Sequence, residues 1–193
     1  MEHLYPLLFE PNLHETVWGG KKLTTWKHLP EHAAPVGESW EVSAVPSSIN
    51  IIANGDFKGM DLVLLINRYP TEILGEHVAK QYKGQMPLLV KFIDARDDLS
   101  IQVHPNDEMA QRVHGKFGKS EMWYIIDADP EASLYVGFKQ KIDENEYKQR
   151  IADGTITDVL ARHKVHAGDV FYLPAGRVHA ICGGILLAEV QQS

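Results

Sequence analysis

The sequence contains only one cysteine, Cys182, in 193 residues. A single thiol cannot form a disulfide within the chain, and this scarcity fits a reducing compartment. Long apolar runs are also missing, because no run is longer than that of residues 62–66, whereas a bilayer requires about 20 residues. The amino terminus lacks the basic region and apolar stretch of a secretory signal. These absences predict a cytoplasmic protein that does not span a membrane.

Basic residues are fewer than acidic residues. The chain has 19 Lys and Arg against 26 Asp and Glu, which gives a formal net charge of −7. Nucleic acids and anionic membranes attract basic surfaces, so this balance argues against both as general partners. A small anionic ligand remains compatible with it, provided that lysines or arginines cluster locally. The apolar fraction of 44% is sufficient for a buried core in one domain of ordinary size.

Short strand-like segments, separated by turn residues, dominate the chain. Segment 61–66 fits either a buried strand or a helix, and Asp61 as a possible N-cap favours the helix. The pattern as a whole favours a mainly β sandwich or barrel with short helical insertions. Strands are expected at 38–43, 48–53, 87–94, 121–127, 133–138, 170–173 and 178–192, the last broken at 182–184, and further helices at 71–77, 107–113, 143–152 and 155–162.

The two ends of the chain differ from its middle. The first 40 residues contain three tryptophans among many glycines and prolines. Disordered arms seldom contain so many aromatic residues, so we expect residues from 1 to about 36 to form an ordered, irregular segment packed on the sheet. Residues 185–193 show a strand pattern without a closing turn. We therefore expect the chain to be a fragment of a longer polypeptide.

Four polar side chains suggest a metal site. Gln102 and His104 stand two residues apart in an extended apolar run, so on a strand they would face the same side. Glu121 opens another strand-like run, and His179 follows the turn 174–177. Two imidazoles, a carboxylate and an amide oxygen form a suitable donor set for zinc or another first-row divalent metal.

The His179 segment has the form G-x5-P-x-G-x2-H over residues 168–179. This motif resembles the second motif of the cupin superfamily of small β-barrels. Pro174 and Gly176 would set a tight turn, and the following strand would direct the imidazole into the barrel mouth. The cupin pattern usually ends in Asn, where this chain has Gly183.

The other ligand segment departs from the usual cupin form. The first cupin motif normally has His-x-His with Glu soon after, whereas here Gln102 takes the first place and Glu121 lies 17 residues beyond His104. In this departure the chain resembles the type I phosphomannose isomerases. The resemblance extends from about residue 6 to the end, through segments 15–20, 37–41, 87–95, 100–107, 118–123, 173–179 and 189–193.

This resemblance implies a fold, a cofactor and a reaction. The fold would be a cupin-type β-barrel or jelly roll, with residues 1–193 as a metal-binding catalytic domain and a further carboxyl-terminal cupin half absent, so that the barrel could be incomplete at that end. The implied zinc ligands are Gln102, His104, Glu121 and His179. The implied reaction interconverts mannose 6-phosphate and fructose 6-phosphate through an enediolate that zinc stabilises. A sugar phosphate is the expected partner.

Two lysines are the catalytic candidates. Lys119 lies two residues before Glu121, so on a strand it would share that ligand's face. It matches a family lysine that would either exchange a proton near the metal or stay charged and pair with the phosphate or the enediolate. Lys91, inside an apolar strand, matches another family lysine near the sugar. The alternative for Lys91 is an ion pair with a neighbouring carboxylate.

Trp18 and Arg177 are candidates for substrate binding. Trp18 could form a wall of the sugar pocket, although packing in the core explains it as well. Arg177 adjoins the turn before His179 and could face either a phosphate or the solvent. The family also uses an arginine just after the segment that corresponds to residues 189–193. We therefore expect this chain to bind about one zinc but to isomerise poorly.

Three other functions fit parts of the pattern. One is a non-catalytic sugar-binding cupin, which would not need Lys119 beside the metal. Another is a cupin fragment with reduced activity. A third is a cupin oxygenase, since two histidines and a carboxylate also suit iron. Gln102 and the isomerase-like segments disfavour the oxygenase.

Overall fold

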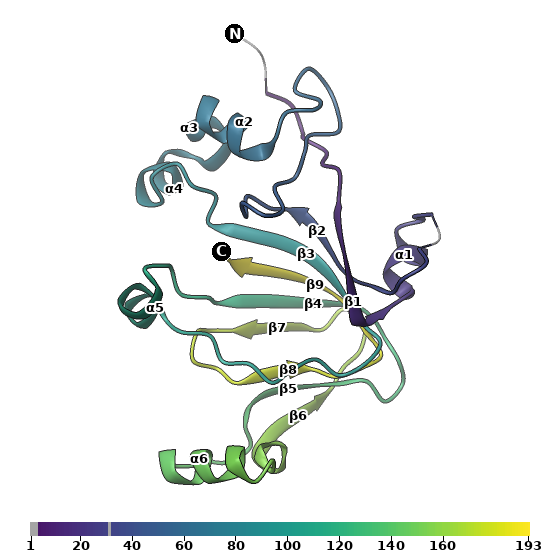
Figure 1. Ribbon diagram of the computed structural model, residues 1–193, viewed down its shortest axis with the longest axis vertical. Coiled ribbons are helices and arrows are strands. Elements are labelled where there is room, and N and C mark those ends of the chain that lie inside the picture. The colour runs from purple at the N-terminus through teal and green to yellow at the C-terminus, as the bar shows by residue number, and fades with distance from the viewer. Residues whose placement is uncertain (1–3, 31) are drawn as a thin grey trace.

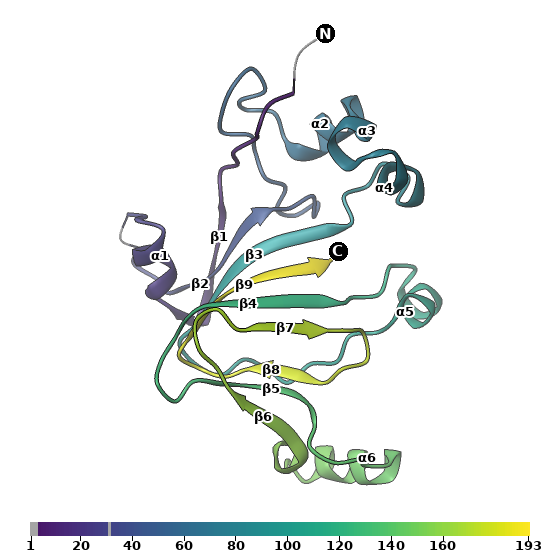
Figure 2. The same cartoon turned by 180° about the vertical axis from the view of Figure 1, so that it is seen from behind.

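The computed structural model describes residues 4–30 and 32–193. Its strands are β1 (Asn12–Gly20), β2 (Val36–Val42), β3 (Leu88–Ala95), β4 (Glu121–Ala128), β5 (Ser133–Phe138), β6 (Leu160–Lys164), β7 (Val170–Leu173), β8 (His179–Ile181) and β9 (Ile185–Gln192). They form a six-stranded sheet in the order β1-β2-β3-β9-β4-β7 and a three-stranded sheet in the order β6-β5-β8 (Figures 1 and 2). All paired strands are antiparallel.

Short helices connect the strands. They are α1 (Lys22–Trp26), α2 (Leu62–Arg68), α3 (Pro70–Leu74), α4 (Glu76–Gln81), α5 (Asp107–His114), α6 (Glu144–Ala152) and the 3-10 helix η1 (Ile156–Val159). As Figures 1 and 2 show, α4 and α5 lie at the end of the sheets where β9 ends, and α1 lies at the opposite end. In the described part of the chain, every helix is too short or too polar to cross a bilayer.

Side chains at helix starts explain where three of the helices begin. Asp61 accepts a hydrogen bond from the backbone N–H of Leu64, as expected for the N-cap of α2. Asn106 and Asp143 accept equivalent bonds at the starts of α5 and α6. Each bond satisfies one backbone donor that the first helical turn leaves unpaired.

The main core lies between the two sheets. Alternate residues of β4, at positions 121, 123 and 125, are buried, as the two-residue period of a strand requires. The core cluster joins Ile93, Trp123, Ile125, Leu173 and Leu187 of the larger sheet to Leu134 and Ile181 of the smaller one. The inner face of β4 thus begins with the carboxylate of Glu121 and continues as hydrophobic core.

A second buried carboxylate, Asp94 on β3, supports α1 by accepting a hydrogen bond from the backbone N–H of Leu23 at 2.9 Å. Burial raises the pKa of Asp94, and the bonds from the α1 backbone oppose this rise. Because the folded-state pKa is raised, stability from this group is greatest below the unfolded pKa and falls as pH rises through the folded value.

We therefore expect Asp94→Asn, which keeps an acceptor oxygen without the charge, to gain stability relative to the wild type as the pH rises above about 4. Urea unfolding of both proteins near pH 4 and near pH 7 measures this difference. If the variant's free energy of unfolding does not rise relative to that of the wild type between pH 4 and pH 7, burial of the Asp94 carboxylate is not the cause.

Three sequence expectations differ from the structure. Segment 48–53 is not a strand, because its backbone bonds go to several partners: Asn50 N–H binds Ser43, and Ile52 N–H binds Met60. Segment 155–162 is helical only at η1 and then becomes β6, because pairing with β5 begins at Leu160. The amino-terminal segment is less irregular than expected, since β1 pairs with β2. Breaks in that register around Glu15 hide the alternation from the sequence.

Candidate metal centre

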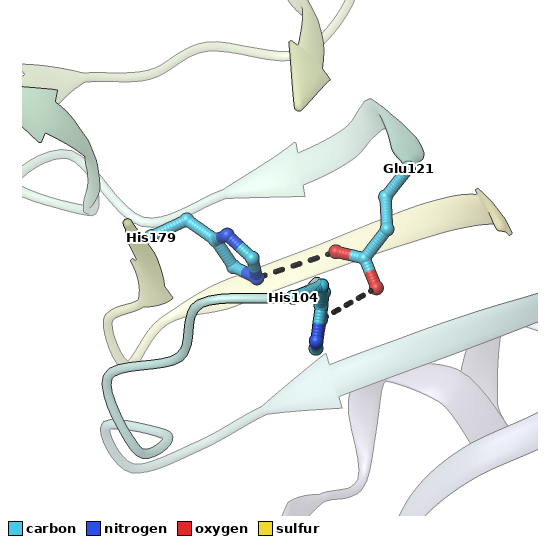
Figure 3. Close-up of side chains that lie close together, drawn as sticks. All are labelled: His104, Glu121 and His179. Atoms are coloured by element: carbon cyan, nitrogen blue, oxygen red, sulfur yellow. Dashed lines mark ion pairs between the residues drawn. The ribbon is translucent and has the colours of Figure 1, made fainter. Parts of the chain in front are cut away.

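Three of the expected ligands meet where the two sheets face each other (Figure 3). His104 lies two residues after Gln102, which forms an isolated β-bridge with His179, while Glu121 begins β4 and His179 begins β8. One ligand atom of each residue lies within 4.8 Å of the others. Glu121 is at the centre of the group: its Oε1 lies 3.2 Å from His104 Nε2, and its Oε2 lies 3.3 Å from His179 Nε2.

Backbone hydrogen bonds align the ligand-bearing segments. Gln102 and His179 exchange two such bonds, of 2.9 and 3.0 Å, and Gly176 N–H donates to the carbonyl of His104 at 2.8 Å. The Pro174–Gly176 turn predicted from the sequence therefore brings β8 alongside the segment that contains Gln102 and His104. Pairing of β4 with β7 and β9 places Glu121 opposite them.

The orientation of His179 is fixed by its own turn. Its Nδ1 lies 2.8 Å from the carbonyl oxygen of Arg177. A carbonyl can only accept, so Nδ1 must be the nitrogen that bears the proton and Nε2 must present a lone pair towards Glu121. Burial lowers the pKa of His179, while the bond to Arg177 opposes that effect, so the ring is neutral at neutral pH. This second bond to an imidazole is the usual arrangement of a metal-binding histidine.

The Nε2 atoms of the two histidines lack protein partners suited to them. His104 Nε2 is buried and has no aligned hydrogen bond, although a carboxylate oxygen lies 3.2 Å away. His179 Nε2 and the Glu121 oxygen facing it are both lone-pair atoms, which repel each other at 3.3 Å unless a cation lies between them. Two imidazole nitrogens and a carboxylate therefore fit a divalent metal ion.

Glu121 is ionised at neutral pH, as a metal ligand must be. Burial alone would raise its pKa, but the imidazole of His104 and the ammonium of Lys119 outweigh burial and lower the pKa to about 2. Lys119 Nζ lies 2.8 Å from Glu121 Oε1. Lys119 therefore lies beside this ligand, as the sequence predicts.

Lys91 lies deeper in the same hollow, between two carboxylates. Its Nζ is 3.2 Å from Glu38 and 3.2 Å from Glu189. Each carboxylate uses its other oxygen to accept an indole N–H at 2.6 Å, from Trp40 and Trp123 respectively. Burial by itself lowers the pKa of Lys91, but the two carboxylates outweigh it and raise the pKa. The ion pair considered as the alternative for Lys91 is therefore present.

The remaining predicted site residues have different settings. Gln102 lines the hollow with Glu121 and His179, and its amide N–H donates to Ser100 Oγ at 3.2 Å. That bond leaves the amide oxygen available as a ligand. Trp18 and Arg177 are not among the residues that line the hollow. Trp18 packs against the main core, which is the second of the two roles considered for it. The backbone carbonyl of Arg177 accepts a hydrogen bond from His179.

Two functional candidates escaped the sequence analysis, namely Glu38 and Glu189, which hold Lys91. A charged residue in an apolar strand singled out Lys91, and the same signal was present for Glu189 in the apolar run of β9. Glu38 had no such signal, because its strand alternates with polar residues.

Comparisons with known proteins identify the family of the chain. Residues 7–149 match the family model of the phosphomannose isomerase type I catalytic domain. The chain is 40% identical to the probable mannose-6-phosphate isomerase GmuF of Bacillus subtilis, covering 98% of this chain and 58% of that protein. It is 38% identical to the mannose-6-phosphate isomerase of Streptococcus mutans, covering 97% of this chain and 58% of that protein.

A solved structure shows the same architecture. The mannose 6-phosphate isomerase from Bacillus subtilis matches with a TM-score of 0.88 at 34% identity, covering 97% of this chain and 58% of that one. The mainly β, cupin-type fold class is thereby confirmed. The chain spans somewhat over half the length of these relatives. Because the family model matches most of its residues, the chain belongs to the type I phosphomannose isomerase family.

Proposed function

We propose that residues 1–193 form the metal-binding domain of a zinc-dependent isomerase that interconverts mannose 6-phosphate and fructose 6-phosphate. The observation that supports this most is the meeting of His104, Glu121 and His179 beside two lysines, in a chain of this family. The relatives GmuF and the Streptococcus mutans protein are named mannose-6-phosphate isomerases, which supports the choice of substrate.

Zinc is the proposed metal because the donor set suits it. His104, Glu121 and His179 would hold the ion, and the amide oxygen of Gln102 would complete the ligands. When bound, zinc supplies a positive charge that stabilises the negative charge developing on a substrate oxygen during enolisation. The carbon proton must still be moved by a group of the protein.

Lys119 and Lys91 have different roles in this proposal. Lys91 is fixed between Glu38 and Glu189 with a raised pKa, so it stays an ammonium ion and suits the orientation of sugar hydroxyls rather than proton abstraction. Lys119 is more exposed, and among the described residues its ammonium forms an ion pair with Glu121 alone. Its position beside a ligand suits proton exchange or pairing with the enediolate. Trp18 and Arg177 contribute through packing and through the backbone.

A substitution at Lys119 separates a catalyst from a sugar-binding protein. We expect Lys119→Met to retain about one zinc per chain and to lose activity by a factor of about 100 or more, the usual contribution of acid–base catalysis. Zinc content is measured on purified protein, and turnover is measured by coupling fructose 6-phosphate formation to a dehydrogenase. The exposed Lys148, which pairs with Glu144 one helical turn away, provides the matched control Lys148→Met.

The wild-type chain must also lose turnover on chelation and regain it with added zinc. Turnover of each variant is compared with that of the wild-type chain of the same length, because we expect the absolute turnover to be low. Activity that survives metal removal, or Lys119→Met turning over like the wild type, would contradict the proposed function.

A further inference from the structure

The chain makes an excursion between two of the ligands. From Pro105 to Ser120 it leaves the site, forms α5 and returns. His104 and Glu121 can meet only if the two ends of this excursion come together. Figure 1 shows α5 beyond the end of β4, to one side of both sheets.

Two hydrogen bonds join the ends of the excursion. The backbone N–H of Gly118 donates to Asp107 Oδ1 at 2.7 Å, and the backbone N–H of Lys119 donates to the carbonyl of Pro105 at 3.1 Å. Pro105 follows His104 directly, and Lys119 lies two residues before Glu121. These bonds therefore connect the segment of one ligand to the segment of another.

Gly118 is required by the closeness of the two segments. It is buried, and a Cβ atom added to it would lie 2.5 Å from the backbone of Asn106 and of Asp107 and 2.8 Å from the carbonyl oxygen of Pro105. Real Cβ atoms do not approach backbone atoms that closely, so any side chain here would push the segments apart. The reason is the close approach and not an unusual backbone conformation.

From these contacts we infer that Asp107 and Gly118 are positioning residues that set the distance between His104 and Glu121 and place Lys119 beside them. This inference rests on the proposed function, because it concerns the same metal site. The sheet holds Glu121 through β7 and β9, and the β8 bridge holds Gln102. The Asp107–Gly118 contact, together with the Lys119–Pro105 backbone bond, connects the His104 side directly to the Lys119 side.

Asp107 also belongs to the first turn of α5, so its effect on the helix must be separated from its effect on the site. Asn106 provides the matched control: it caps the same helix by accepting from Met109 N–H at 2.9 Å but makes no bond to Gly118. Asp107→Asn is the conservative variant, because its amide oxygen can still accept the bond from Gly118.

Zinc affinity, measured by competition with a chromophoric chelator, tests the inference. We expect Asp107→Ala to weaken zinc binding by about 10- to 100-fold, the usual loss when a residue that orients a ligand is removed. Asp107→Asn should bind nearly as well as the wild type, and so should Asn106→Ala. Equal zinc affinity in Asp107→Ala and Asn106→Ala would overturn the inference.

A glycine pair gives a second test on steric grounds. Gly118→Ala should weaken zinc binding. Gly115 has a left-handed backbone conformation with open space around it, so Gly115→Ala should destabilise the end of α5 but leave zinc binding unchanged. Thermal unfolding of the metal-free proteins shows whether each variant folds. Similar zinc affinity in the two variants would contradict the steric role of Gly118.

Hydrogen exchange of the Gly118 amide tests the Asp107–Gly118 contact independently of the proposed zinc-dependent function. In metal-free protein, the Gly118 amide should exchange slowly in the wild type and in Asp107→Asn, and faster in Asp107→Ala. A wild type that binds no zinc would overturn the proposed function, and the exchange data would still decide the contact. Unchanged exchange at Gly118 in Asp107→Ala would overturn the inference itself.

Discussion

Replacing His104 with alanine is expected to remove zinc and isomerase activity together. His104 Nε2 is buried without an aligned protein partner, and its ring centroid lies 4.9 Å from that of His179, as expected for two ligands of one ion. Loss of a direct ligand should weaken zinc binding by more than about 100-fold, because even residues behind the ligands commonly cost 10- to 100-fold. Zinc content after dialysis and turnover of mannose 6-phosphate measure the two effects.

His166 provides the control for this substitution. Its side chain lies in the turn before β7 and is 73% exposed. The imidazole Nδ1 lies 3.8 Å from Asp169 Oδ2, which is too far for a hydrogen bond. His166→Ala should therefore retain zinc and activity. Zinc bound with wild-type affinity in His104→Ala would show that the ligand assignment is wrong. Zinc retained with activity lost would assign His104 to catalysis alone.

Replacing Lys91 with methionine is expected to lower the free energy of unfolding by about 3–5 kcal/mol, the usual cost of removing one partner from a buried ion pair. Lys91 is 8% exposed and Glu189 is 3% exposed, so the carboxylate left behind has little access to water. Burial raises the pKa of Glu189, and the ammonium of Lys91 opposes that rise. Urea unfolding of the metal-free proteins at neutral pH measures the loss.

The same pair predicts how this loss depends on pH. Without Lys91, the folded-state pKa of Glu189 lies further above its unfolded value. The loss of stability in Lys91→Met is therefore smallest below the unfolded pKa of Glu189, about 4.3, and it grows as the pH rises. Adding Glu189→Gln to Lys91→Met should recover part of the lost stability at neutral pH. Lys148→Met, which breaks an exposed i,i+4 pair, should cost only about 0.5 kcal/mol. An equal loss in Lys91→Met and Lys148→Met would contradict the buried pair.

Local signals predicted most of the strands. Segments 121–127, 133–138 and 170–173 lie in β4, β5 and β7, because apolar residues bounded by turn residues leave few alternatives there. The failures have a different cause. Segment 48–53 is apolar enough for a strand, but its backbone finds several partners and no single neighbouring strand. Partner availability is a property of the whole fold, and a single sequence does not show it.

The candidate site divides in the same way. His104, Glu121 and His179 lie in contiguous motifs, so their proximity could be expected once a family resemblance was recognised. The partners of Lys91 could not be named, because Glu38 and Glu189 are brought to it by pairing of β3 with β2 and β9. The Asp107–Gly118 contact was equally hidden, since nothing in the sequence indicates that a loop glycine meets the first turn of the preceding helix.

The position of β9 has a consequence for how the protein folds. This strand is the last of the sequence, yet it lies between β3 and β4 in the larger sheet. Until it is synthesised, two apolar strands have no partner on their facing edges, and the residues that surround Lys91 cannot assemble. Such non-local pairing slows folding and leaves strand edges open to association with other chains. We expect nascent chains that stop before residue 185 to be sensitive to aggregation and unable to retain zinc.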